Sequence, residues 1–121
     1  MIFEIWTYKA TLPNSNQIKT RPVLIIGDDS ENELNIVDIH YCMVSASSLK
    51  GKYDVDIEEK TAKNLGLTKA SIIKTTKIYT GSRGLLGDKI CDLPNQLKNE
   101  FIDKYKKYQD SIVCTMNNNL V

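Results

Sequence analysis

One arginine lies where a polar segment meets a strongly apolar one. Residues 12–17 are polar, residues 23–26 are apolar, and Arg21 stands between them. We expect a loop to enter a buried strand here, so that a rigid element would hold Arg21 facing whatever the loop binds. A guanidinium carries a planar fork of donors that suits phosphate oxygens. The same position would suit an ion pair with Asp28 or Glu58, and the residue types favour neither interpretation.

The other chemistry-bearing residues predict no familiar catalytic or metal centre. His40 is the single histidine and lies within an apolar stretch, so a Ser–His–Asp or Cys–His pair lacks support. The Gly-rich residues 81–84 lack the lysine spacing of a phosphate-binding P-loop. The acids between 28 and 59 lack calcium-loop spacing, and the 3 cysteines form no CxxC pair. We therefore expect neither a metal nor a cofactor.

Charge is unevenly distributed, although the net charge is only +1. Residues 28–59 hold nine acids against two lysines, whereas residues 60–91 hold seven bases against one acid. This asymmetry would suit a basic surface for phosphates, or two halves that neutralise each other in the fold.

The size and composition predict one globular domain that spans residues 1–121. A chain of 121 residues with 41% hydrophobic and 26% charged residues is neither collagen-like nor a disordered tail. The longest apolar run is far too short to cross a bilayer, and the first residues lack the pattern of a signal peptide. A cytoplasmic location is therefore the expectation.

Most of the first two thirds of the chain has the alternating pattern of strands. Pro22 has no N–H and is expected to be the first residue of its strand. The predicted strands cover residues 3–8, 21–26, 35–44, 53–57, 70–79 and 85–90.

Two helices are predicted as well. Residues 60–66 favour a short helix that ends at Gly66, and residues 97–112 carry apolar side chains at helical spacing after Pro94. Short strands followed by one amphipathic helix indicate a mainly β fold, a small antiparallel barrel or curled sheet.

Several segments, in chain order, resemble the MazF/PemK/Kid family of bacterial toxins. The strongest are Thr-Arg-Pro-Val-Leu-Ile-Ile at residues 20–26 and Leu-Thr-Lys-Ala-Ser-Ile-Ile at residues 67–73. Gln17 matches a loop glutamine of the family, Phe-Glu-Ile-Trp at residues 3–6 takes the place of its first strand, and residues 89–93 fit the segment before the last helix. The similarity covers essentially the whole chain.

The resemblance implies a fold and an activity. The fold would be an SH3-like barrel of five to seven strands with a short helix and a C-terminal amphipathic helix, assembled as a homodimer. The activity would be that of a type II toxin–antitoxin endoribonuclease, which cleaves single-stranded RNA through attack of a ribose 2′-hydroxyl without a metal. Its partners would be RNA and a cognate antitoxin with an acidic or amphipathic tail.

The resemblance also implies roles for individual residues. Arg21 would stabilise the scissile phosphate, and Ser45 would orient a phosphate oxygen, with Ser47 and Ser48 as alternatives to Ser45. Lys74 stands where some members have the arginine of an Arg-x-Asp pair, and the aspartate is absent. The residues expected to contact RNA are Gln17, Lys19, Thr20, Lys74 and Lys77.

Other interpretations remain open at this point. The same fold could serve as a non-catalytic RNA- or peptide-binding module, or as a structural or DNA-associated β domain. Unpaired bases could stack on Tyr8 or Tyr79, although either ring could equally belong to the core or to an interface.

Overall fold

The computed structural model describes residues 1–11, 17–28, 38–46 and 49–120. Residues 12–16 of the predicted loop, residues 35–37 of the strand predicted at 35–44, and the alternatives Ser47 and Ser48 lie outside the described residues.

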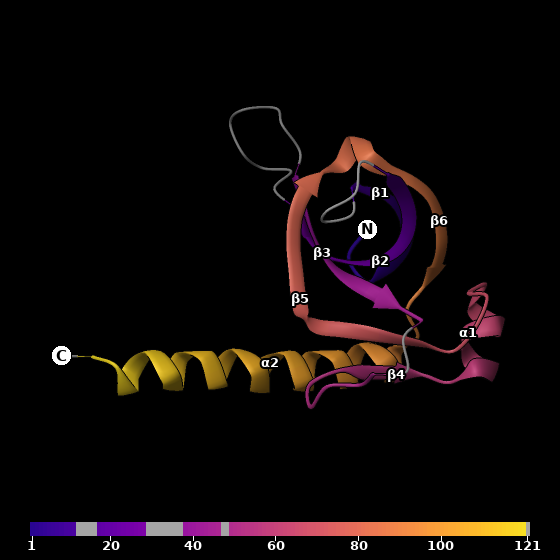
Figure 1. The fold of residues 1–121 in the computed structure, drawn as a ribbon. Coiled ribbons are helices and arrows are strands. Elements are labelled where there is room, and N and C mark those ends of the chain that lie inside the picture. Colours follow the sequence, from indigo (N-terminus) through magenta and orange to yellow (C-terminus); the bar gives the residue numbers. More distant parts are fainter. Residues whose placement is uncertain (12–16, 29–37, 47–48, 121) are drawn as a thin grey trace.

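Six strands form one curled antiparallel sheet in the order β4-β5-β3-β2-β1-β6 (Figure 1). The strands are β1 (Glu4–Thr11), β2 (Ile18–Asp28), β3 (Asp38–Ser45), β4 (Val55–Ile57), β5 (Ser71–Ser82) and β6 (Leu86–Asp92). A 3-10 turn, η1 (Arg83–Leu85), joins β5 to β6, and α1 (Glu59–Leu65) and α2 (Asn95–Asn118) are the two helices. The predicted mainly β class, the strand number and both helices are confirmed.

The second strand begins earlier than its hydrophobicity suggested. β2 starts at Ile18, because residues 18–20 pair with the end of β1 even though their side chains are exposed. Pro22 therefore lies inside the strand, opposite Thr7, and its prediction as the first residue was wrong. The strand tolerates Pro22 because pairing with β3 begins only at Val23, so the missing N–H falls on a locally unpaired edge.

Strand β5 bends sharply along its pairing with β3, and its first residues also pair with β4. Cys42 pairs with Ile78, but Val44, two residues further along β3, pairs with Ile73. The extra residues of β5 form an irregularity at which the strand turns, as Figure 1 shows. Bulges of this kind increase twist and help a sheet to close upon itself.

Two apolar clusters fill the molecule. The larger one contains Leu24, Ile73, Leu93 and Phe101, with Phe101 anchoring α2. The smaller one is made of Tyr8, Val23, Ile25, Ile39 and Tyr41, and Met43 packs against it. Alternate residues of β2 contribute to different clusters, as expected for a sheet that is covered on both faces.

Phe3 occupies a backbone conformation that normally favours glycine. Its φ is 65°, and its amide and carbonyl bond to Ile25 O and Leu93 N, both at 2.8 Å. The aromatic ring packs edge-on against Phe101 with the ring centroids 6.1 Å apart. Burial of this ring offsets the strain of a positive φ, which is typically about 1–3 kcal/mol for a non-glycine residue.

Helix α2 extends well beyond the sheet that it packs against (Figure 1). It reaches Asn118, further than the predicted end at residue 112, and its last residues are exposed. Among the residues that the structure describes, no helix is long and apolar enough to span a membrane.

Candidate phosphate-binding site

Arg21 lies within β2, opposite Tyr8 of β1, and not at a loop-to-strand junction as predicted. The junction was misplaced because the exposed start of the β1–β2 hairpin carries no apolar pattern. Rigid strand pairing nevertheless holds the backbone of Arg21. Its Nε atom is buried and, within the described part of the chain, has no hydrogen-bond partner.

The alternative that Arg21 serves an ion pair finds no support in the described residues. Neither Asp28 nor Glu58 lies within ion-pairing distance of it. Most buried polar nitrogens in proteins are hydrogen-bonded, so the unpaired Nε distinguishes Arg21 among the described residues.

Arg21 lines a hollow of about 200 Å³. The lining residues are Arg21, Pro22, Val44, Ser45, Ala46, Leu67, Thr68, Lys69 and Ser71. This set combines two cations with three hydroxyl side chains, and none of these lining residues is an acid. Hydroxyl donors beside fixed cations are the groups that bind phosphate oxygens, and a missing carboxylate removes the repulsion that an anion would meet.

Ser45 reaches the hollow because of the register between β2 and β3. Val23 pairs with Met43, so the same antiparallel register places Arg21 across from Ser45, the last residue of β3. On its other side Ser45 pairs with Ile72 of β5. The structure thus brings together the two residues that the resemblance proposed as catalytic.

The segment after α1 forms another wall, which sequence reasoning gave no role. Gly66 ends α1 with a φ of 93°, and the following Leu67 is buried and donates its amide to Ala62 O at 2.9 Å. The hydroxyl of Ser71 donates to Lys69 O at 3.0 Å, which shapes the turn into β5. The glycine stop followed by a leucine signalled the turn, but only the tertiary structure shows that Lys69 lines the same hollow as Arg21.

The residues expected to contact RNA are scattered. Gln17, Lys19 and Thr20 are exposed at the far end of the β1–β2 hairpin, and Lys77 is exposed on β5. None of them lines the hollow of Arg21.

Lys74 is engaged in the structure of the protein itself. Its Nζ is 3.0 Å from Oδ2 of Asp54, whose side chain is only 5% exposed, and it also donates to Leu49 O at 2.5 Å. Asp54 accepts a further bond from the amide of Gly51 at 2.7 Å. Lys74 therefore anchors the segment before β4 and compensates a buried carboxylate.

The remaining nucleophiles and metal ligands are poorly placed for catalysis. Nδ1 of His40 lies 2.9 Å from Oγ1 of Thr80, on a part of β3 away from the hollow. Burial raises the pKa of the Cys42 thiol to about 12, which suppresses its reactive thiolate. Among the described residues, no three metal-ligating side chains of the His, Cys, Asp or Glu type lie together.

A model of the PemK-like, MazF-like toxins of type II toxin–antitoxin systems matches residues 2–115. This chain belongs to that toxin family. A search of curated protein sequences found no match.

Solved structures with the same fold include toxins from mycobacteria. A mycobacterial endoribonuclease in complex with its cognate antitoxin aligns with a TM-score of 0.64 at 14% identity, over 88% of this chain and 91% of that one. The Mycobacterium tuberculosis toxin MazF-mt6 aligns with a TM-score of 0.65 at 18% identity, over 87% of this chain and 96% of that one. A further mycobacterial endoribonuclease aligns with a TM-score of 0.60 at 15% identity, over 87% of this chain and 86% of that one. These alignments establish the curled barrel as the fold of this toxin family member.

Replacing Lys74 should destabilise the protein because Asp54 would be left buried without its counter-charge. Lys74→Met is expected to reduce the free energy of unfolding by about 3 kcal/mol, the low end for breaking a buried pair. In a double-mutant cycle, adding Asp54→Asn should cost much less than it does alone. Urea unfolding measures both, with exposed Lys77→Met as the matched control. If urea unfolding gave Lys74→Met and Lys77→Met the same free energy of unfolding, the anchoring role of Lys74 would be contradicted.

Proposed function

We propose that this protein is a toxin–antitoxin endoribonuclease that cleaves single-stranded RNA at the hollow of Arg21. The observation that carries the proposal is the acid-free hollow in which the guanidinium of Arg21, with its buried and unpaired Nε, is accompanied by one further cation, Lys69, and three hydroxyl side chains. Membership of the toxin family supports it, and so does the fold that the chain shares with two mycobacterial endoribonucleases.

The chemistry suited to this hollow is an internal phosphoryl transfer. The ribose 2′-oxygen attacks the adjacent phosphorus and loses its proton, while the bond to the 5′-oxygen breaks and that oxygen gains a proton. The products are a 2′,3′-cyclic phosphate and a 5′-hydroxyl end. Negative charge accumulates on the phosphoryl oxygens in the transition state, so preorganised cations lower the barrier.

Each lining residue then has a distinct role. Arg21 stabilises the phosphoryl oxygens through its fork of donors, and Ser45 orients one of them from the opposite strand. Lys69 supplies the second cation. The exposed Gln17, Lys19, Thr20 and Lys77 would hold flanking parts of the RNA, whereas Lys74 acts through its contact with Asp54.

The whole chain would act as one domain of residues 1–121 in the cytoplasm, where messenger RNA is available. Its RNA would be single-stranded because unpaired bases can be splayed out and recognised individually.

Arg21→Ala should reduce the cleavage rate of single-stranded RNA by roughly 100-fold or more, the usual loss when one charge stabiliser is removed. Arg21→Lys should recover only part of this, because an ammonium lacks the two-pronged geometry. A gel-based assay in EDTA measures the rates, and thermal melts verify folding.

Arg83→Ala, which removes an exposed arginine on η1, is the control and should cut normally. An Arg21→Ala protein that cuts as fast as the parent would refute the site. A parent protein that cuts none of many RNA sequences would refute the function.

A cognate antitoxin should cover the hollow with an acidic or amphipathic segment, since the hollow is cationic. The polypeptide encoded beside this toxin is the candidate, and it should suppress cleavage. Lysine acetylation followed by mass spectrometry should show Lys69 protected in the complex, while exposed Lys63 on α1 stays reactive. Unchanged acetylation of Lys69 in an inhibited complex would place the antitoxin elsewhere.

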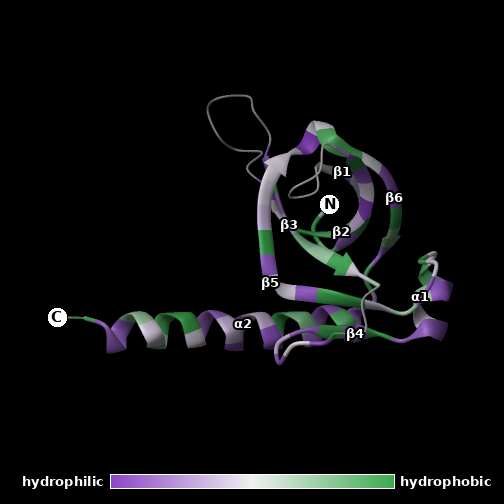
Figure 2. Cartoon of the chain, in the orientation of Figure 1, coloured by the Kyte–Doolittle hydropathy of each residue, from purple (hydrophilic) through white to green (hydrophobic). Residues whose placement is uncertain are grey.

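We also propose a homodimer that uses the projecting end of α2. Val113 and Met116 are 52% and 63% exposed at a helical spacing, and apolar colour continues along this end of the helix in Figure 2. Such a stripe can pair with its own copy about a two-fold axis. Phe101, an aromatic residue of the same helix, is unsuitable for such an interface because it is buried within its own chain.

Met116→Glu is expected to shift the protein from dimer to monomer. Sedimentation velocity measures this at a protein concentration on the order of tens of micromolar. Thr115→Glu places the same charge one residue away from the stripe and should leave the dimer intact. A parent chain that sediments as a monomer would exclude the dimer itself.

A further inference from the structure

Three tyrosines from three strands form a continuous stack. The rings of Tyr8 and Tyr41 have centroids 4.6 Å apart, and those of Tyr41 and Tyr79 are 5.7 Å apart at an interplanar angle of 27°. Tyr41 of β3 and Tyr79 of β5 are direct partners on neighbouring strands, whereas Tyr8 comes from β1, which β2 separates from β3, so the curl of the sheet brings Tyr8 onto Tyr41. Gly81 makes room for this arrangement, since a Cβ there would collide with the Tyr8 hydroxyl.

Exposure differs greatly along the stack. Tyr8 is 4% exposed and Tyr41 is 7% exposed, whereas Tyr79 is 46% exposed. The expectation that a base could stack on Tyr8 is therefore wrong, because that ring is already covered. Tyr79 is held against Tyr41 and still presents nearly half of its surface to solvent.

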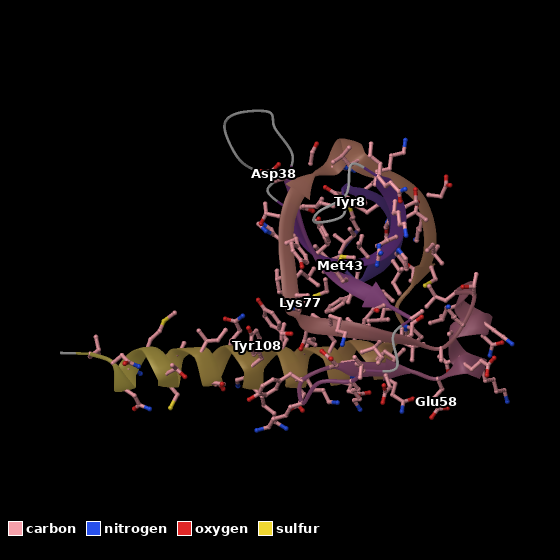
Figure 3. The ribbon with its side chains drawn as sticks, in the orientation of Figure 1. Tyr8, Asp38, Met43, Glu58, Lys77 and Tyr108 are labelled. Carbon is pink, nitrogen blue, oxygen red and sulfur yellow. The ribbon has the colours of Figure 1, made fainter. Side chains whose placement is uncertain are left out.

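The stack shares a strand face with the catalytic hollow. Tyr41, Met43 and Ser45 alternate along β3 and point to one side of the sheet. Met43 packs against the cluster that contains Tyr8 and Tyr41, and Figure 3 draws Tyr8 and Met43 within the curl of the sheet. Four residues of strand separate Tyr41 from Ser45, a distance of roughly 13 Å. Nucleotides that flank the scissile phosphate would cover this span.

The surroundings of Tyr79 suit a nucleotide. Lys77, two residues earlier on β5, is exposed and is labelled in Figure 3 at the bend of that strand. Burial and the neighbouring Tyr8 raise the pKa of Tyr41 to about 12, so this supporting ring remains a neutral phenol at physiological pH.

We propose that Tyr79 is a stacking platform for an unpaired RNA base beside the scissile nucleotide, with Lys77 holding the adjoining phosphate. The inference rests on the proposed RNA-cleaving function and adds a subsite that sets the position of the substrate. Aromatic stacking accepts any base, so this subsite would align the strand without reading its sequence. The buried part of the stack fixes the ring in place before RNA arrives, which reduces the entropic cost of binding.

The test uses a single-stranded RNA that the parent protein cuts, with a 2′-deoxy sugar at the mapped cut site to prevent cleavage. Fluorescence anisotropy gives the dissociation constant for the parent and for Tyr79→Phe, Tyr79→Ala and Tyr108→Ala. Tyr79→Ala should bind about tenfold more weakly, within the range for one stacked base, while Tyr79→Phe should match the parent. Tyr108 of α2 packs against Tyr53 and does not line the hollow, so Tyr108→Ala removes a tyrosine of another cluster and should bind normally.

An abasic scan identifies the stacked base directly. Removing one base at a time from the RNA should weaken binding to the parent at one flanking position. At that position Tyr79→Ala should show no further loss, because the protein and the base lose the same contact. This coupling separates stacking from a general effect of the substitution on the fold.

The outcomes distinguish this inference from the proposed function. If Arg21→Ala abolishes cleavage while Tyr79→Ala binds RNA within about twofold of the parent, well below the effect of one stacked base, the subsite is wrong and the function stands. Additive losses from the abasic RNA and Tyr79→Ala would also overturn the subsite. If the parent cuts no RNA, the function fails and the subsite fails with it.

Discussion

The backbone pairing of β2 with β3 is the constraint on which the candidate site depends. The last pair is Val23 with Met43, and the same register continued by two residues brings Arg21 opposite Ser45 and decides which face of the sheet both side chains use. Because side chains alternate with a period of two, a slip of one residue would turn Arg21 away from Ser45 and would move Val23 and Ile25 out of their cluster. The apolar residues that fix the register of the core therefore fix the geometry of the hollow as well.

The hollow also requires a contribution from outside these two strands. The turn after α1 carries Thr68, Lys69 and Ser71 to the open end of the β2–β3 pair. Gly66 permits the abrupt end of α1, and burial of Leu67 secures the turn. A cation on a short, well-anchored turn loses less freedom on binding an anion than one on a long loop. The site is thus assembled from three segments far apart in the chain.

In the folded protein, some basic residues form ion pairs with acids of the chain and others line the hollow. Lys74 compensates Asp54 in a partly buried network, and Lys89 pairs with Glu4 and Asp92 near the end of β6. Lys63 and Lys104 join acids one helical turn away. Within the described residues, two bases of the basic segment, Lys63 and Lys74, thus pair with acids of residues 28–59, which is the mutual neutralisation that the charge distribution left open, but only for part of the segment. Arg21 and Lys69 are different, because the hollow that they line contains no acid.

The sequence by itself determined the class of the fold and the identity of Arg21 as the residue to examine. Alternating apolar residues indicated the strands, Gly66 indicated the end of α1, and the helical spacing after Pro94 indicated α2, since each of these signals is local. The exposed start of β2 was not predicted, because its residues pair with β1 through the backbone and show no alternation of apolar side chains in the sequence. The partners of Arg21, Lys74 and Tyr79 were decided only by tertiary structure. They depend on strand register, on the bend of β5 and on the curl of the sheet, which join residues that no local pattern connects.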